Sequence, residues 1–212
     1  MDYINEIKAL VPDYAKDVRI NLDGTLGRSS LPANEAAAVA LAAAFAARSP
    51  GLVAIIRNAA ALPEAEANAA LTAAALMGMN NVWYPYVEMS GDAELKTLPA
   101  QLRMQAYATH GGVDKRRFEL FALAASIVGK CEHCVQSHYA LLKQDGVSVE
   151  QLRDVGRIAA VKVLAMPDVR AKLLQQTAVP IGNSPEQFRA QIISERDKMI
   201  DLVKRQGIKL EQ

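Results

Sequence analysis

Alanine-rich runs with a helical pattern, separated by prolines and glycines, constrain the fold of this chain more than any other feature. Hydrophobic residues make up 51% of the 212 residues, and aromatic residues only 5%. Alanine favours the helix, and its small side chain lets neighbouring helices approach closely. No segment shows the sustained period-two alternation that a half-buried strand requires. The sequence therefore predicts an all-α protein.

Capping and helix-breaking residues predict where the helices begin and end. Helices are expected at about 2–10, 12–21, 33–48, 50–62, 64–84, 99–109, 115–129 and 131–145, then at 149–165, near 167 and at 184–204, with a loop at 24–30. The Ser148-x-x-Gln151 capping box and the Asp114 N-cap are strong start signals. The stretches 70–78 and 121–129 share an apolar pattern and a terminal glycine, which is consistent with an internal duplication of a helical unit.

Charge and hydropathy narrow the compartment and the partners. The formal net charge is +1, which gives no electrostatic reason to expect nucleic acid or an anionic membrane as a partner. The polar start of the chain lacks the basic region of a signal peptide, and no uninterrupted apolar run is long enough to span a bilayer. We therefore expect a cytoplasmic protein, in which a pair of thiols is redox-active or metal-binding rather than a structural staple.

The two cysteines of the chain, Cys131 and Cys134, stand in one C-x-x-C motif. Because Gly129 ends one helical run, the pair is expected in the first turn of the next helix, where residues three apart are neighbours. The free N–H groups and the positive dipole end of that turn favour a thiolate, the reactive form of cysteine. The motif therefore predicts a dithiol redox site, and the spacing alone leaves either cysteine as the attacking thiol.

Histidines and a carboxylate accompany the cysteines. His138 lies four residues after Cys134 on the same helix face, where an imidazole can take or return the thiol proton. Glu119, on the preceding helix, is expected to bond this imidazole or a bridging water, or alternatively to pair with Arg116 or Arg117. His133 points about 100° away from Cys134, which leaves an exposed and a catalytic role open.

These residues resemble the AhpD-type alkylhydroperoxidases of the carboxymuconolactone-decarboxylase-like superfamily. The signature of that family is a glutamate, eleven residues, Cys-x-x-Cys, three residues and a histidine, which matches Glu119, Cys131, Cys134 and His138. The stretches PDYAKDVRINL at 12–22, MGMNNVWY at 77–84, and LRM and FEL around 102–120 add to the resemblance. It covers roughly residues 1–178, so the expected organisation is an AhpD-like helical domain at 1–178 and an added C-terminal helix at 179–212.

The resemblance implies an alkyl hydroperoxide reductase without a tightly bound cofactor or metal. Cys134 matches the cysteine that attacks peroxide and Cys131 the resolving cysteine, with His138, Glu119 and, as an auxiliary member, His133 in a proton relay that acts partly through water. Implied partners are an organic hydroperoxide, the peroxiredoxin AhpC and a lipoyl-bearing acyltransferase, whose dihydrolipoamide is the reductant. A homo-oligomer, commonly a trimer, is also implied.

Three other functions compete with this interpretation. The chain could be a protein disulfide reductase without its own peroxidase activity. It could also be a decarboxylase of a lactone acid, as elsewhere in the superfamily, although that chemistry does not need a reactive dithiol. Finally, Cys131, Cys134 and His138 have metal-like spacing, so a zinc-stabilised helical binding module is an alternative, but no second Cys/His pair completes four ligands.

Overall fold

The computed structural model describes residues 2–110, 112–164 and 193–194, and the described chain is helical without strands. The α-helices are α1 (Asp2–Leu10), α2 (Lys16–Leu22), α3 (Ala33–Ala46), α4 (Pro50–Ala59), α5 (Glu64–Ser90), α6 (Ala93–Thr97), α7 (Ala106–His110), α8 (Lys115–Gly129), α9 (Glu132–Gln144) and α10 (Val149–Leu164). A 3₁₀ turn (Asp13–Ala15) precedes α2, and a π-helical turn (Asp23–Gly27) follows it. The predicted all-α class is confirmed.

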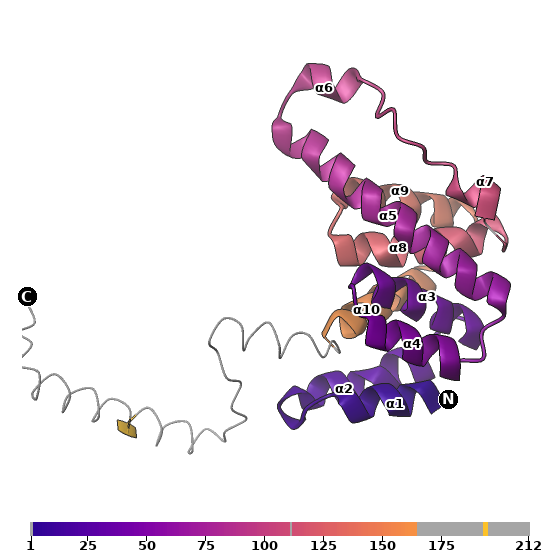
Figure 1. Cartoon of the computed structure of the whole chain (residues 1–212), viewed down its shortest axis with the longest axis vertical. Helices are drawn as coiled ribbons and strands as arrows, with labels where there is room; N and C mark the ends of the chain where they lie inside the picture. The colour runs from indigo at the N-terminus through magenta and orange to yellow at the C-terminus, as the bar shows by residue number, and fades with distance from the viewer. Residues whose placement is uncertain (1, 111, 165–192, 195–212) are drawn as a thin grey trace, which may run out of the picture.

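Helix α3 forms the centre of the molecule. Its residues 36–44 are all at most 2% exposed. A helix that is apolar on every side must be surrounded, and α3 is packed against α4, α5, α8 and α10. Helix α5 crosses the molecule from the α3–α4 end to the protruding α6 (Figure 1). It also packs on α8 and α9. The two helices that carry the cysteine motif therefore both lie against one long helix, α5.

Several predicted helix boundaries are confirmed by their hydrogen bonds. The Ser148 N–H donates to Gln151 Oε1 (3.1 Å) and the Gln151 N–H to Ser148 Oγ (3.2 Å), the reciprocal pair of a capping box. The Asp114 carboxylate accepts the Arg117 N–H at the start of α8. Gly146, with φ +81°, follows the end of α9.

The predicted end of α5 at Tyr84 is wrong. The helix continues through Pro85 to Ser90 and ends at Gly91, whose φ of +65° a glycine adopts without strain. Proline removes one hydrogen bond of the helix ladder. On the two sides of Pro85, the Tyr84 ring stacks on His133 and Glu88 pairs with Lys96.

Two further local predictions are also wrong. The predicted helix at 99–109 is reduced to α7, because Gln101 adopts a left-handed φ of +52° that interrupts a helix. A short helix instead starts after Asp92, whose carboxylate accepts the N–H groups of Glu94 and Leu95. The first part of the loop predicted at 24–30 forms a π-helical turn, held by Thr25 Oγ1 donating to the Asn21 carbonyl at 2.8 Å.

Other predictions remain untested. The stretches 70–78 and 121–129 lie in α5 and α8, which pack on each other and both on α3, but the duplication stays a prediction. The predicted helices near 167 and at 184–204, and the domain boundary at 178, lie essentially outside the described residues. Among the residues that are described, no helix is long and apolar enough to cross a membrane.

Candidate active site

A tight turn between α8 and α9 places the C-x-x-C motif. Lys130 follows the last residue of α8 in the left-handed conformation (φ 56°, ψ 31°). Its N–H donates to the Ile127 carbonyl, and the Cys131 N–H donates to the Ser126 carbonyl at 3.3 Å. These two bonds form a Schellman motif, which terminates α8 and redirects the chain. Cys131 therefore lies at the N-cap of α9.

Gly129 is required by a close neighbour rather than by its backbone angle. A Cβ atom at this position would lie 2.0 Å from Asn81 Nδ2 and 2.8 Å from Asn81 Cβ. Asn81 Nδ2 donates to the Ala125 carbonyl at 3.1 Å. The Asn81 side chain thus binds the C-terminal end of α8 to α5, and glycine provides the space for it.

Cys131 and Cys134 form a disulfide, with their Cα atoms 5.3 Å apart. Cys131 Sγ also accepts the Cys134 N–H at 3.3 Å, so a sulfur occupies the capping position of α9. Both cysteines are buried, at 0% and 3% exposed. The predicted location of the pair in a first helical turn is confirmed, and the N–H groups there favour negative charge on sulfur in the reduced state.

His138 lies one turn further along α9 and contacts a different element at each ring nitrogen. Nδ1 is 2.5 Å from Glu119 Oε2 on α8, and Nε2 is 3.2 Å from Met77 Sδ on α5. The Glu119 and His138 side chains are 14% and 15% exposed. Nδ1 thus faces a strong acceptor, a carboxylate, and Nε2 faces a weak one, a thioether.

The alternative partners of Glu119 are engaged elsewhere. The Arg116 guanidinium pairs with the buried Glu35 of α3. Arg117 pairs with Asp114 at 2.7 Å and with the buried Glu66 of α5 at 3.3 Å. Glu119 thus meets the imidazole, as one of the two sequence-based hypotheses expected.

His133 is exposed at the start of α9 and stacks on Tyr84 of α5, with ring centroids 4.3 Å apart. Its ring lines two neighbouring cavities. One, of about 380 Å³, is also lined by Glu88, Lys130 and Glu132. The other, of about 300 Å³, includes Trp83 and Tyr84. These cavities flank the end of α9 that carries the disulfide.

Met77, Asn81 and Tyr84 had no assigned role in the sequence-based site. All three lie in the stretch 77–84 that carried part of the family resemblance, and all contact α8 or α9. Residues at spacings of three, four and seven share one helix face, so the sequence could have shown that these three side chains lie together on one face of α5. It could not show which helix packs against that face.

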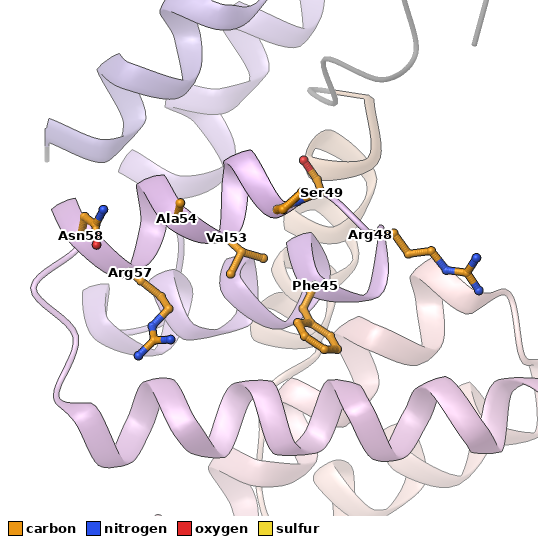
Figure 2. A pocket seen from close by; sticks show the side chains of 8 residues that line it. Phe45, Arg48, Ser49, Val53, Ala54, Arg57 and Asn58 are labelled. Carbon is orange, nitrogen blue, oxygen red and sulfur yellow. The ribbon is translucent and has the colours of Figure 1, made fainter. Parts of the chain in front are cut away.

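A larger cavity, of about 770 Å³, lies at the corner between α3 and α4, and residues of the disulfide region are not among its lining (Figure 2). Phe45 and Val53 supply apolar surface, and Arg48 and Arg57 lie towards its two ends. This cavity is larger than the two beside His133, but the reactive groups lie at the α8–α9 junction. In the described parts of the chain, no three His, Cys, Asp or Glu side chains are grouped to hold a metal ion.

Comparison with known proteins identifies relatives of this chain. Residues 93–173 match the carboxymuconolactone decarboxylase family. An alkyl hydroperoxide reductase AhpD from Rhodospirillum centenum is 44% identical over 177 residues, which cover 82% of this chain and 95% of that protein. AhpD proteins from a Bradyrhizobium species and from Streptomyces avermitilis are 42% and 41% identical, each over 74% of this chain, with 88% and 90% of the relatives covered.

Proposed function

The chain belongs to the carboxymuconolactone decarboxylase family and, within it, to the AhpD-type proteins, and from this premise we propose that it is an alkyl hydroperoxide reductase that works through Cys131 and Cys134. The observation that carries this proposal is the disulfide in the first turn of α9, one turn before a histidine held by Glu119 at 2.5 Å. Thiol redox chemistry needs a closable sulfur pair and a group that moves protons, and this junction contains both.

The reaction begins with the reduced pair. The Cys134 thiolate attacks the O–O bond of the hydroperoxide, which leaves a sulfenic acid on sulfur and releases an alkoxide. His138, as imidazolium, supplies the proton that converts this alkoxide to the alcohol. The Cys131 thiol then condenses with the sulfenic acid, forming the disulfide and water. The peroxide has gained two electrons, and the two sulfurs have lost them.

Cys134 is assigned the attack and Cys131 the resolution. The family resemblance gives this order, and the spacing of the motif leaves either thiol as a candidate.

A dithiol donor must reopen the disulfide through a mixed disulfide, which needs no tightly bound cofactor. We assign this role to protein-bound dihydrolipoamide, and we infer that the reduced site in turn regenerates the peroxiredoxin AhpC. The two sulfurs are nearly buried, and in this proposal the donor approaches from the two cavities beside His133. His133 therefore belongs, in this proposal, to the entrance as well as to the auxiliary relay.

A homo-oligomer, commonly a trimer in the family, completes the proposal. Val82, Tyr86 and Met89 are 68%, 51% and 80% exposed, and their spacing of four and three residues places them on one face of α5. Such an exposed apolar stripe is typical of an interaction surface. In light scattering, Met89→Glu is expected to reduce the molar mass of the assembly, and Ile20→Glu, an exposed site on α2, is not.

The test of the function is coupled turnover with cumene hydroperoxide and dihydrolipoamide. Wild-type protein should turn over, and Cys134→Ser and Cys131→Ser should each abolish steady-state turnover because the disulfide cannot form. Turnover only with oxidised AhpC, and not with peroxide, would instead identify a disulfide reductase without its own peroxidase activity. Absence of both activities would refute the proposal.

A further inference from the structure

The cavity at the corner between α3 and α4, called the corner cavity below, has a lining that the dithiol chemistry does not use (Figure 2). Its volume of about 770 Å³ lies within the range of small-molecule sites, which are mostly apolar with a few well-placed polar groups. Phe45, an aromatic residue at the end of α3, is 42% exposed beside it. The described residues that line the cavity include two arginines and no carboxylate. The corner cavity therefore combines apolar surface with positive charge.

The two arginines of the corner cavity, Arg48 and Arg57, have no acidic partner within the described part of the chain. In this they differ from Arg19, Arg116 and Arg157, each of which pairs with a carboxylate. A guanidinium remains charged in a protein and can bind a carboxylate through two parallel hydrogen bonds. The free arginines therefore favour an anionic ligand.

The backbone of Arg48 has a conformation that normally belongs to glycine. Its φ is +56°. The Arg48 N–H donates to the Phe45 carbonyl at 2.9 Å, and the Ser49 N–H donates to the Ala44 carbonyl at 3.1 Å. These bonds end α3 in a Schellman motif, in which the left-handed position is usually a glycine. Arginine at this position carries backbone strain, which is a reason to look for a use of its side chain.

The start of α4 adds polar groups next to Arg48. Ser49 is the N-cap residue of α4, but its side chain makes no capping hydrogen bond. Ser49 is only 3% exposed and lines the corner cavity, so a buried hydroxyl without a partner among the described residues borders it. The first N–H groups of a helix favour an anion. A guanidinium, a hydroxyl and the positive end of a helix thus lie together at one end of the cavity.

We propose that the corner cavity binds a medium-chain carboxylate, a molecule that joins an anionic head to an alkyl chain. Arg48, the Ser49 hydroxyl and the first turn of α4 bind the carboxylate. The alkyl chain lies along Phe45 and Val53 towards the aliphatic stem of Arg57. Ser49 and Arg57 are eight residues apart, about 12 Å along the axis of α4, and this distance limits the length of the chain. The inference goes beyond the proposed dithiol function and does not depend on it.

Isothermal titration calorimetry of the intact protein with decanoate tests the site without any peroxide. Decanoate should bind at a single site per chain. Both 1-decanol, which lacks the charge, and acetate, which lacks the chain, should bind at least tenfold more weakly, a rough estimate for loss of a charge-assisted contact or of the buried chain. From octanoate to decanoate, the affinity should rise by roughly twofold to fourfold for each added CH₂ group.

Substitutions in the lining test where decanoate binds. Arg48→Gln should weaken binding about tenfold, because it removes a charged donor. Ala54→Glu places a carboxylate at an exposed position of the lining, and it should abolish measurable binding by blocking the cavity and repelling the anion. The matched controls are Arg103→Gln and Ala160→Glu, exposed positions that do not line the cavity, and both should bind decanoate as the wild type does.

Arg48→Gly separates a binding role of the guanidinium from a structural one. Glycine adopts a φ of this sign without strain, so the variant should unfold at a denaturant concentration no lower than that of the wild type. It should nevertheless bind decanoate about tenfold more weakly, as Arg48→Gln does. Weaker binding by a protein that is no less stable indicates a contact between the guanidinium and the ligand.

Three results would overturn the inference. The first is that decanoate does not bind to the wild-type protein. The second is an affinity for 1-decanol equal to that for decanoate, which indicates an apolar surface that does not recognise the anion. The third is wild-type affinity for decanoate in both Arg48→Gln and Arg48→Gly. A wild-type protein that lacks peroxide turnover refutes the proposed function instead and leaves the calorimetric result unaffected.

Discussion

The two ring nitrogens of His138 have unequal partners, and this inequality determines what the residue can do. Nδ1 meets a carboxylate oxygen at 2.5 Å, whereas Nε2 meets a thioether at 3.2 Å. The carboxylate fixes the ring orientation. The thioether is a weak acceptor, so in the proposed relay Nε2 is the nitrogen that exchanges protons.

Loss of the carboxylate charge should therefore disable the relay without unfolding the site. We predict that Glu119→Gln lowers peroxide turnover roughly 10²-fold, and that His138→Phe has an effect at least as large. Coupled turnover with dihydrolipoamide measures both, and Glu150→Gln, an exposed position on α10, serves as the control. Wild-type rates in the two site variants would exclude a rate-limiting proton transfer by this pair.

The close approach of Asn81 to Gly129 allows a second prediction about a single residue. In Gly129→Ala, the new Cβ would come within 2.8 Å of three Asn81 atoms. We expect a loss of about 1–3 kcal/mol in the free energy of unfolding, with reduced turnover because the turn before Cys131 shifts. Denaturant unfolding measures the first effect.

The control for this steric effect is Gly78→Ala in α5, where the added Cβ has nothing within 4 Å. That change should be neutral or stabilising by up to about 1 kcal/mol, since alanine favours the helix. Removing the opposing amide with Asn81→Ala should recover part of the Gly129→Ala loss. Equal stability of Gly129→Ala and wild type would contradict the close approach.

Individual elements differ in how well the sequence predicts them. Helix starts at Asp114 and Ser148 were predictable, because their caps are hydrogen bonds between residues three apart. The passage of α5 through Pro85 was not, because a proline inside a helical pattern normally ends the helix. The spacing of Glu119 and His138 indicated their role, but nothing gave a role to Met77, which lies 61 residues from the imidazole that it contacts.

The capping box at the start of α10 allows a prediction about the stability that this helix gives to the protein. Ser148→Ala removes the hydroxyl that accepts the Gln151 N–H, so the free energy of unfolding should fall by about 1 kcal/mol. Turnover per folded molecule should be unchanged, since α10 packs on α3 and α8 and none of its described side chains belongs to the proposed site. Denaturant unfolding and an activity assay on the same sample check both parts.

At the scale of the whole molecule, the buried carboxylate of Asp154 connects the last described helix to the N-terminal part of the chain. Asp154 of α10 is 1% exposed at its side chain, and its Oδ2 accepts both the N–H and the hydroxyl of Ser30 at 2.8 Å. Its Oδ1 accepts from Arg157 at 2.9 Å, and Arg157 also donates to the Gly24 carbonyl. One side chain thus fastens α10 to the segment between α2 and α3, 124 residues away.

The charge of Asp154 makes this connection dependent on pH. Burial alone would raise the pKa of this carboxyl, but hydrogen bonds from Ser30 and Arg157 and the charge of Arg153 outweigh it and hold the pKa below its ordinary value. A carboxyl whose pKa is lower in the folded state stabilises the fold at every pH above its unfolded pKa of about 3.9. This contribution is lost as the pH falls through the folded pKa.

Asp154→Asn should accordingly destabilise the protein at neutral pH by about 2 kcal/mol, the scale of hydrogen bonds to a charged group. The difference in unfolding free energy between wild type and variant should persist down to about pH 4 and shrink below it, as the wild-type carboxyl takes up a proton. Denaturant unfolding over a pH series measures this difference, with Asp145→Asn, exposed at the end of α9, as the control. A difference that stays constant into the acid range would show that the packing of the side chain, and not its charge, holds α10 to the N-terminal helices.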